Sequence, residues 1–365
     1  MSWHGRRAGN MAAWNLMLAL LGACGPGPES VPPPEGSEAP GPVLPLGFTS
    51  VPALPDNPTT PEGVALGRWL FYSSLLSSNG RVSCASCHVQ AHAFSLDASL
   101  ATTGVSGRPL VRHVPSLINL AWMDGLFWDG GAKNLESLSL GPITHPDEMG
   151  QRDLQALMER LASTPEAVQR FEAAFGPGGP TLGQLLRALA QFQRTLVSAR
   201  SRYDSWRRGE PGGELSALEQ AGHGLVRTRC TPCHDTELFT DNAYHNNGLD
   251  SVWGEGEDAT RGRGRITLRP EDTGRYKTPT LRNVVRSAPY MHDGRFATLD
   301  AVLEHYRRGV VPSSTLDIAL RGDSHRAPGV PLSDVEKAAL LLFLDTLTDE
   351  AFLGDPALGA PSTGP

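Results

Sequence analysis

The sequence predicts an all-α protein made of two domains that share one plan, with long loops between the helices. Three observations predict this fold class. Apolar residues recur at helical spacing through most of the chain, and a five-residue cysteine–histidine motif occurs once in each half. No stretch shows the alternation of apolar and polar residues that is typical of strands. A chain of 365 residues is long enough to bury a core in each of two domains.

The first 23 residues have the composition of an export signal. Arg6 and Arg7 form a charged start, and an apolar stretch follows over residues 14–21, too short to span a bilayer stably. Residues 21–24 (Leu-Gly-Ala-Cys) resemble a lipobox, at which cleavage leaves a lipidated cysteine as the new N-terminus. We therefore predict a periplasmic lipoprotein that meets the membrane only through Cys24. Ordinary cleavage beside a free cysteine is the alternative.

The rest of the chain divides by composition. Residues 24–58 are dominated by Pro, Gly, Ser and Glu, which bury too little apolar surface to fold, and they predict a tether. We predict a first domain over residues 59–210, a second over 211–349 and a flexible tail over 350–365. The formal net charge of -7 provides no basic surface, so we expect no nucleic-acid partner.

Helices of the first domain can be placed from their caps. Pro61 favours a helix start, and the apolar positions after it lead into the first motif. Thr181 is a candidate N-cap for a second helix. One face of this second helix carries Leu182, Leu185, Leu186, Leu189, Phe192 and Leu196. We expect that face to pack in the core.

The second domain repeats the order of helix and motif. Glycines within residues 209–213 break the helical pattern, and a new helix from about Ser216 runs into the second motif. A capping box of Ser333 and Glu336 starts a last helix, which runs to about Leu347.

The two motifs point to a cofactor. Residues 84–88 are Cys-Ala-Ser-Cys-His, and residues 230–234 are Cys-Thr-Pro-Cys-His. This is the attachment pattern of c-type haem, in which two thiols add to the porphyrin vinyl groups and the histidine binds the iron. The motifs predict two covalent haems held by Cys84, Cys87, Cys230 and Cys233, with His88 and His234 as proximal ligands. A structural zinc site would not require a histidine after each pair, and a thioredoxin-like pair would accompany a βαβ pattern.

Several further segments resemble the di-haem cytochrome c peroxidase and MauG family. They are residues 126–130 (Leu-Phe-Trp-Asp-Gly), 141–143, 148–150, 277–284 and 288–294, in the family's order. The resemblance covers about residues 61–346 and implies two cytochrome c-like haem domains. It also implies that the N-terminal haem is the one that reacts with peroxide.

The resemblance assigns roles on the peroxide side by position. Trp128 corresponds to the tryptophan between the haems that relays electrons, and Pro142 to the proline that crowds the distal face. Glu148 corresponds to the distal carboxylate, which can move a proton from one peroxide oxygen to the other. Without the resemblance, Trp128 is a core aromatic residue and Glu148 a solvated one.

Two positions depart from the family pattern. Leu138 lies ten residues after Trp128, where family members commonly have a glutamine. His113 replaces the asparagine that binds calcium between the haems, and the other ligands would be the main-chain carbonyls of Ser287 and Pro289. Imidazole is a poor ligand for a cation that prefers oxygen, so a calcium ion here would need water in the asparagine's place.

The sixth ligand of the second haem separates the subfamilies. It is a methionine in the peroxidases and a tyrosine in MauG-type enzymes, and Tyr306 lies at this position, seventeen residues after Pro289. A thioether ligand raises the reduction potential, whereas a phenolate stabilises high-valent iron. Met291 is a rival ligand, although the family uses its position for packing. We expect His305 to be a surface residue.

The first haem is expected to be five-coordinate. Some peroxidases cap this haem with a loop histidine in the resting state, and His92 is the candidate here. His92 lies only four residues from His88, which is too close to reach the opposite face of the haem.

These features favour a MauG-type enzyme that uses hydrogen peroxide to oxidise a residue of a partner protein, tryptophan above all, by long-range electron transfer. The predicted lipid anchor, Tyr306 and residues 244–249 (Tyr-His-Asn-Asn-Gly-Leu) resemble the MbnH-type members most. The alternative enzyme is a cytochrome c peroxidase that reduces hydrogen peroxide with electrons from a small cytochrome or cupredoxin. A plain electron-transfer cytochrome would need strong ligands on both faces of both irons, and no sixth ligand for the first is evident.

Overall fold

The structure is a computed structural model that describes residues 43–52, 54–96, 103–255 and 259–362. Residues 42–365 form one compact unit, so the predicted boundary near residue 210 stays a prediction. The predicted export signal, Cys24 and most of the tether lie outside the described residues. Within the described ranges, no helix has the length and apolar character needed to cross a membrane.

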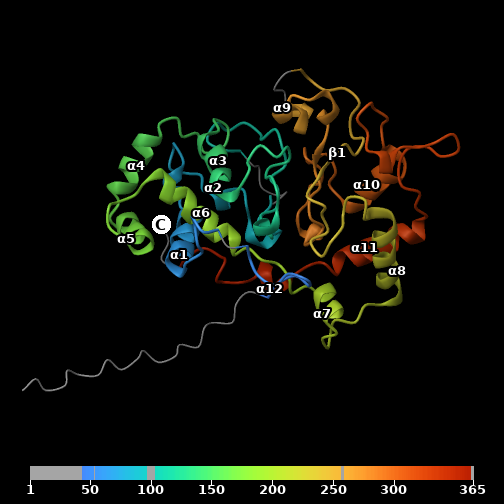
Figure 1. The fold of residues 1–365 in the computed structure, drawn as a ribbon, viewed down its shortest axis with the longest axis horizontal. Coiled ribbons are helices and arrows are strands. Elements are labelled where there is room, and N and C mark those ends of the chain that lie inside the picture. Colours follow the sequence, from blue (N-terminus) through green and yellow to red (C-terminus); the bar gives the residue numbers. More distant parts are fainter. Residues whose placement is uncertain (1–42, 53, 97–102, 256–258, 363–365) are drawn as a thin grey trace, which may run out of the picture. The chain divides into compact units, whose positions relative to one another are not determined.

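Most of the regular secondary structure in the described chain is helical, and long loops join the helices (Figure 1). The helices of the first half are α1 (Pro61–Tyr72), α2 (Leu135–Leu138), α3 (Leu140–Thr144), α4 (Leu154–Ala162), α5 (Pro165–Phe175), α6 (Leu182–Arg194) and α7 (Arg202–Arg208). Those of the second half are α8 (Ala217–Leu225), α9 (Arg263–Thr267), α10 (Leu299–Glu304), α11 (Asp334–Asp345) and α12 (Glu350–Leu353).

The all-α prediction needs one correction. β1 (Tyr244–His245) pairs antiparallel with β2 (Tyr276–Lys277) and forms a two-stranded ribbon. Strands of two residues are too short to show an alternating pattern, so the sequence could not predict them. This ribbon holds together the long loops of the second half.

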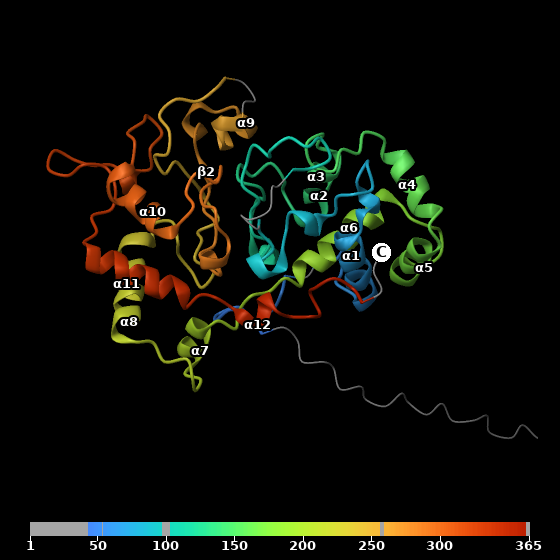
Figure 2. The same ribbon diagram turned by 180° about the vertical axis from the view of Figure 1, so that it is seen from behind.

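The first core forms around α1 and α6, which lie side by side (Figures 1 and 2). The predicted helix start at Pro61 and the predicted cap at Thr181 are confirmed. α1 begins at Pro61, where the Thr60 side chain accepts from the Gly63 amide, and Thr181 forms a capping box before α6. The two helices approach closely because Gly67 faces the Ala188 carbonyl, where a Cβ would lie 1.9 Å from the oxygen. This packing fixes the end of α1, from which the chain enters the first motif.

The second core repeats this arrangement with α8 and α11, again side by side in both views (Figures 1 and 2). The predicted helix start at Ser216 and the predicted capping box at Ser333 are confirmed, and Ser216 forms a capping box as well. Gly222 faces the Ala339 carbonyl, and a Cβ there would lie 2.1 Å from its oxygen. After α8, a π-helical turn over Val226–Cys230 carries the chain directly into the second motif.

The prediction of a flexible tail is wrong for most of its length. α12 forms within it, and Phe352 is fully buried, with its ring 5.8 Å from that of Phe94 in the first core. Beyond α12, the Arg68 side chain of α1 donates to the carbonyls of Pro356 and Gly359. The tail is ordered because its apolar side chains complete a core that is distant in the sequence.

A buried ion pair joins α7 to the loop before α10. Both Arg282 amino groups donate to the Asp204 carboxylate at 2.8 Å, and neither side chain is more than 1% exposed. Replacing Asp204 by Ala is expected to lower the free energy of unfolding by about 3–5 kcal/mol, because it leaves a buried guanidinium without its partner. Chemical denaturation measures the loss. The control is Glu166→Ala at the partly exposed pair with Arg170, expected to cost about 1 kcal/mol or less; equal losses would contradict the prediction.

Candidate functional site

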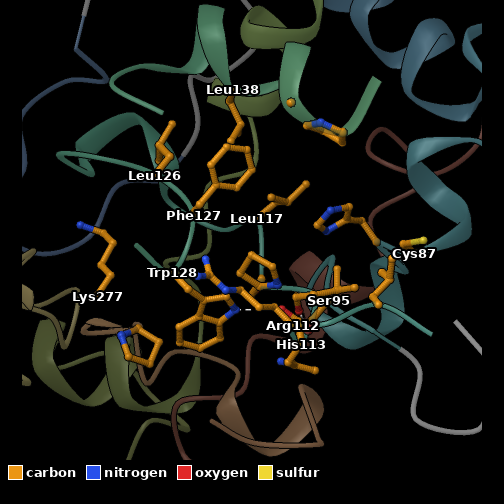
Figure 3. A pocket seen from close by; sticks show the side chains of 18 of the residues that line it. Cys87, Ser95, Arg112, His113, Leu117, Leu126, Phe127, Trp128, Leu138 and Lys277 are labelled. Atoms are coloured by element: carbon orange, nitrogen blue, oxygen red, sulfur yellow. Dashed lines mark hydrogen bonds between the residues drawn. The ribbon is translucent and has the colours of Figure 1, made fainter. Parts of the chain in front are cut away.

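A cavity of about 540 Å³ lies beside the first motif, within the range of roughly 300–1,000 Å³ typical of ligand and cofactor sites. Residues of both halves line it. Figure 3 shows Cys87 on one side, Phe127 and Leu138 on another, and Trp128 near Arg112 and His113.

The histidine of each motif is prepared as a metal ligand by its neighbours in sequence. His88 Nδ1 lies 2.7 Å from the Phe94 carbonyl oxygen, and His234 Nδ1 lies 3.0 Å from the Phe239 carbonyl oxygen. An Nδ1–H that donates to a carbonyl leaves the Nε2 lone pair free to bind a metal. Burial lowers the pKa of His88 to about 4, although hydrogen bonds with the carbonyls of Phe94 and Pro115 act to raise it. The ring is therefore neutral at pH 7.

The cysteines of the motifs fit a covalent cofactor better than zinc. Burial raises the pKa of the Cys84 thiol to about 12 and that of the Cys87 and Cys230 thiols to about 11, so these groups are neutral at pH 7. Zinc binds thiolates and usually four side chains. Across the described ranges, no cluster of three or more His, Cys, Asp or Glu side chains could hold a metal ion.

A tight turn after α3 forms another wall of the cavity. Pro142 and Glu148 both line the cavity, and the Glu148 amide donates to the His145 carbonyl at 3.1 Å. Burial raises the pKa of Glu148, and the nearby His145 opposes the rise, its Nδ1 lying 3.7 Å from Glu148 Oε1. This wall combines a carboxylate with the apolar side chain of Leu138.

Trp128 is fixed from both halves of the chain. Its indole N–H donates to the His113 carbonyl at 2.8 Å, and the Lys277 amide of β2 donates to the Trp128 carbonyl at 2.8 Å. The next residue, Asp129, is fully buried and pairs with Arg112 and with Arg265 of α9. These arginines hold the pKa of the Asp129 carboxyl below its usual range although burial acts to raise it.

His113, Ser287 and Pro289 line the same cavity, as the predicted calcium site requires. His113 is 8% exposed, and its Nε2 has no hydrogen-bond partner. Burial lowers the pKa of its ring to about 4, with a further contribution from His88. A neutral imidazole does not fit calcium, which takes oxygen ligands. We therefore assign no calcium to these residues.

The second site brings Tyr306 toward the second motif. Tyr306 lies in a π-helical turn over His305–Gly309 that extends α10. Burial raises the pKa of Tyr306 to about 12, with smaller contributions from the nearby Cys233 and Cys230, whereas a hydrogen bond from Asn247 opposes the rise. Asn247 Nδ2 lies 3.5 Å from the Tyr306 hydroxyl and 3.4 Å from Met291 Sδ. Both predicted candidate ligands thus contact one amide group.

Comparisons with known proteins agree on one family. The model of the di-haem cytochrome c peroxidase family matches residues 61–212. The chain is 38% identical over 306 residues to the methylamine utilization protein MauG of Methylorubrum extorquens, covering 82% of each chain. It is 31% identical over 382 residues to the cytochrome-c peroxidase IdrP1 of Denitromonas iodatirespirans, covering 96% of this chain and 97% of the relative.

Among solved structures, a MauG-like protein associated with microbial copper homeostasis superposes with a TM-score of 0.74 at 32% identity, over 86% of this chain and 97% of that one. The chain belongs to the di-haem cytochrome c peroxidase and MauG family. It is a haem peroxidase-type oxidoreductase with two haem groups. Membership implies hydrogen peroxide as a reactant and a partner protein or small redox protein.

The structure corrects the prediction for His305 and shows where His92 lies. His305 is only 7% exposed, and its Nε2 lies 3.0 Å from the Asn247 carbonyl, so the expectation of a surface residue is wrong. The reason is that β1 and the loop after it cover this end of α10. His92 Nδ1 lies 3.0 Å from the Arg286 carbonyl, and His92 is not among the described residues that line the first cavity.

Three side chains of the sites were not predicted from the sequence. His145 lies beside Glu148 without any motif that marks it as functional, and Asp129 was noted only as part of a family segment. His245 lies between the carboxylates of Asp241 and Asp317, at 2.7 and 2.6 Å. Asp129 and His245 lie in segments that the sequence analysis singled out, but their partners Arg265 and Asp317 are distant in the sequence, so no local pattern indicated these contacts.

The His245 cluster makes the stability of the protein depend on pH. A hydrogen bond with the Cys233 sulfur and, to a smaller extent, the two carboxylates raise the pKa of His245 to about 10. If Cys233 forms a haem thioether, only the two carboxylates raise this pKa. A raised pKa in the folded state means stabilisation that is fully present below the unfolded value of about 6.5 and is lost as pH rises through the raised folded-state pKa. The unfolding free energy of the wild type should therefore exceed that of His245→Gln by an amount that shrinks over this range.

Chemical denaturation of both proteins across this pH range measures the difference. The control is His325→Gln in an exposed loop, which should show no such trend. A difference between wild type and His245→Gln that stays constant with pH would contradict the prediction.

Proposed function

We propose that this enzyme binds both haems covalently, through Cys84 and Cys87 and through Cys230 and Cys233, with His88 and His234 as iron ligands. It uses hydrogen peroxide to oxidise a residue of a partner protein, tryptophan above all. The observation that carries this proposal is the position of Tyr306, whose hydroxyl contacts Asn247 beside the second motif. When bound, the haem irons take up the two oxidising equivalents of peroxide.

On the peroxide side, Glu148 is the acid–base group. As a carboxylate it can accept a proton from one oxygen of hydrogen peroxide and return it to the other oxygen, which leaves as water. Leu138 and Pro142 make the neighbouring wall of the cavity apolar. The burial that raises the pKa of Glu148 also makes it a stronger base than an exposed glutamate.

Between the two sites, Trp128 transfers electrons. Its indole N–H donates to the His113 carbonyl, and its main-chain carbonyl accepts from the Lys277 amide, so both the ring and the backbone are fixed. The buried pairs of Asp129 fasten the next residue to α9. A rigid ring costs less reorganisation in each transfer, which supports a relay.

At the second site, Tyr306 would hold the second haem through its hydroxyl oxygen, which the Asn247 amide would orient. Oxygen ligation stabilises oxidised iron and suits a centre that stores oxidising equivalents. The similarity to a MauG-like protein associated with microbial copper homeostasis supports a partner in copper handling, as in MbnH-type enzymes. A lipid anchor on Cys24 would hold the enzyme at a membrane facing the periplasm.

One observation favours the peroxidase alternative. Met291 Sδ lies 3.4 Å from the same Asn247 amide, so a thioether is available beside the second motif. With Met291 as ligand, the second haem would receive electrons from a small cytochrome or cupredoxin for the reduction of peroxide to water.

The test adds one equivalent of hydrogen peroxide to the fully ferric protein and records its visible and near-infrared spectrum. A long-lived species with a near-infrared charge-resonance band supports the proposal, since both haems then share two oxidising equivalents. A reaction that begins only after half-reduction contradicts it and supports the electron-fed peroxidase. Mass spectrometry of the denatured protein should also find both haems retained on the chain.

A further inference from the structure

Aromatic rings form a continuous cluster behind the second motif. Tyr203 of α7 lies at its centre, with its ring centroid 5.2 Å from that of Phe239 and 6.0 Å from that of Trp206. His223 of α8 contacts both Tyr203 and Trp206, at 5.7 and 5.2 Å. This cluster belongs to the second core, but one of its members also reaches the second site.

That member is Phe239. Its carbonyl oxygen lies 3.0 Å from His234 Nδ1, and its ring meets the Tyr203 ring edge to face. At the other end, Trp206 is half-buried in the last turn of α7 and packs against the cluster. A hydrogen bond therefore joins the predicted iron ligand His234 to the Phe239 main chain, and rings in contact lead on from Phe239 through Tyr203 to Trp206, which reaches solvent.

The Tyr203 hydroxyl has an unusual partner for a buried tyrosine. It donates to Glu237 Oε2 at 2.9 Å and accepts from Arg207 Nη1 at 2.7 Å, and Arg207 also pairs with Glu237. Oxidation of a phenol at neutral pH requires a base for its proton, and Glu237 is such a base. By contrast, the hydroxyls of Tyr72 and Tyr276 donate to main-chain carbonyls, which cannot take up a proton.

We propose that Tyr203 and Trp206 carry oxidising equivalents from the second haem site to the surface of α7, with Glu237 as the proton acceptor. This inference rests on the proposed function, because hydrogen peroxide is the oxidant. Tyr203 gives one electron toward the second site and its proton to Glu237. Trp206 then gives one electron to Tyr203, and the proton returns from Glu237. The net change is the loss of one electron from Trp206, which an aromatic residue of the docked partner replaces.

The experiment uses the ferric holoenzyme, treated with several equivalents of hydrogen peroxide without a partner. Peptide mass spectrometry then locates oxygenated residues, and freeze-quenched electron paramagnetic resonance records protein radicals. We expect oxygenated Trp206 in the wild type, because its oxidised side chain has no partner to restore it and reacts with dissolved dioxygen. We expect no such product in Trp206→Phe.

The decisive variant is Tyr203→Phe, which keeps the ring and removes only the hydroxyl. It should lower oxygenation of Trp206 by about ten-fold or more, since positioned proton transfer typically contributes roughly 10²–10⁴-fold to a rate. The matched control is Tyr72→Phe, which removes a hydroxyl bonded to a carbonyl and should leave Trp206 oxygenation unchanged. Unfolding curves and visible spectra verify that each variant is folded and holds both haems.

Two results separate the failure of this path from the failure of the proposed function. If the long-lived oxidised state forms but Trp206 is unmodified, or equally modified in Tyr203→Phe, the path is wrong and the proposed function stands. If the ferric protein does not react with peroxide at all, both are wrong.

Discussion

Replacing Glu148 by Gln is expected to slow the reaction of the ferric enzyme with hydrogen peroxide by about 10²–10⁴-fold, the usual contribution of a positioned acid–base group. Glutamine keeps the size and polarity of the side chain but cannot accept a proton. Stopped-flow absorption of the haem bands measures the rate. The matched control is Glu159→Gln on the exposed face of α4, which should react as the wild type does.

The pH dependence of this rate provides a second check. The base must be ionised, and burial raises the pKa of Glu148 above its usual value of about 4.3. The rate of the wild type should therefore fall on acidification at a higher pH than an exposed glutamate would give, and the inflection should be absent in Glu148→Gln. A wild-type rate in the variant, or the same inflection, would remove Glu148 from the proposed mechanism.

Replacing Tyr306 by Phe is expected to abolish the long-lived shared oxidised state and its near-infrared band. The variant loses the oxygen that is proposed to bind the second haem but keeps the ring in the turn after α10. Axial ligands set haem potentials over a range of about 0.8 V, so this loss should change the second haem more than any other single substitution near it. Spectroscopy after one equivalent of peroxide, with a redox titration of both haems, measures the effect.

Met291→Leu is the matched control, because Met291 contacts the same Asn247 amide as Tyr306. It should leave the band and the potentials close to those of the wild type. If Met291→Leu removes the band and Tyr306→Phe does not, methionine is the ligand and the peroxidase alternative is favoured. Tyr306→Met should raise the potential of the second haem, because a thioether replaces an oxygen ligand.

Features that depend on neighbours in sequence were predictable. The capping boxes before α6, α8 and α11 require residues three positions apart, and the helices begin where these boxes predict. The motif histidines are likewise local, since His88 bonds a carbonyl six residues on and His234 one five residues on. The family segments also predict Trp128 and Pro142 as site residues, and both line the first cavity.

Only the tertiary structure decided which distant groups meet. Asp129 pairs with Arg265, which is 136 positions away in the sequence. His305 bonds the Asn247 carbonyl, which is 58 positions away. Phe352 is ordered only because the first core accepts its ring. The sequence by itself determined the helices and the attachment motifs, because caps and periodicity act over a few residues. The ion pairs of Asp129 and His245 and the aromatic path through Tyr203 join residues that are distant in the sequence, and only folding brings their side chains together.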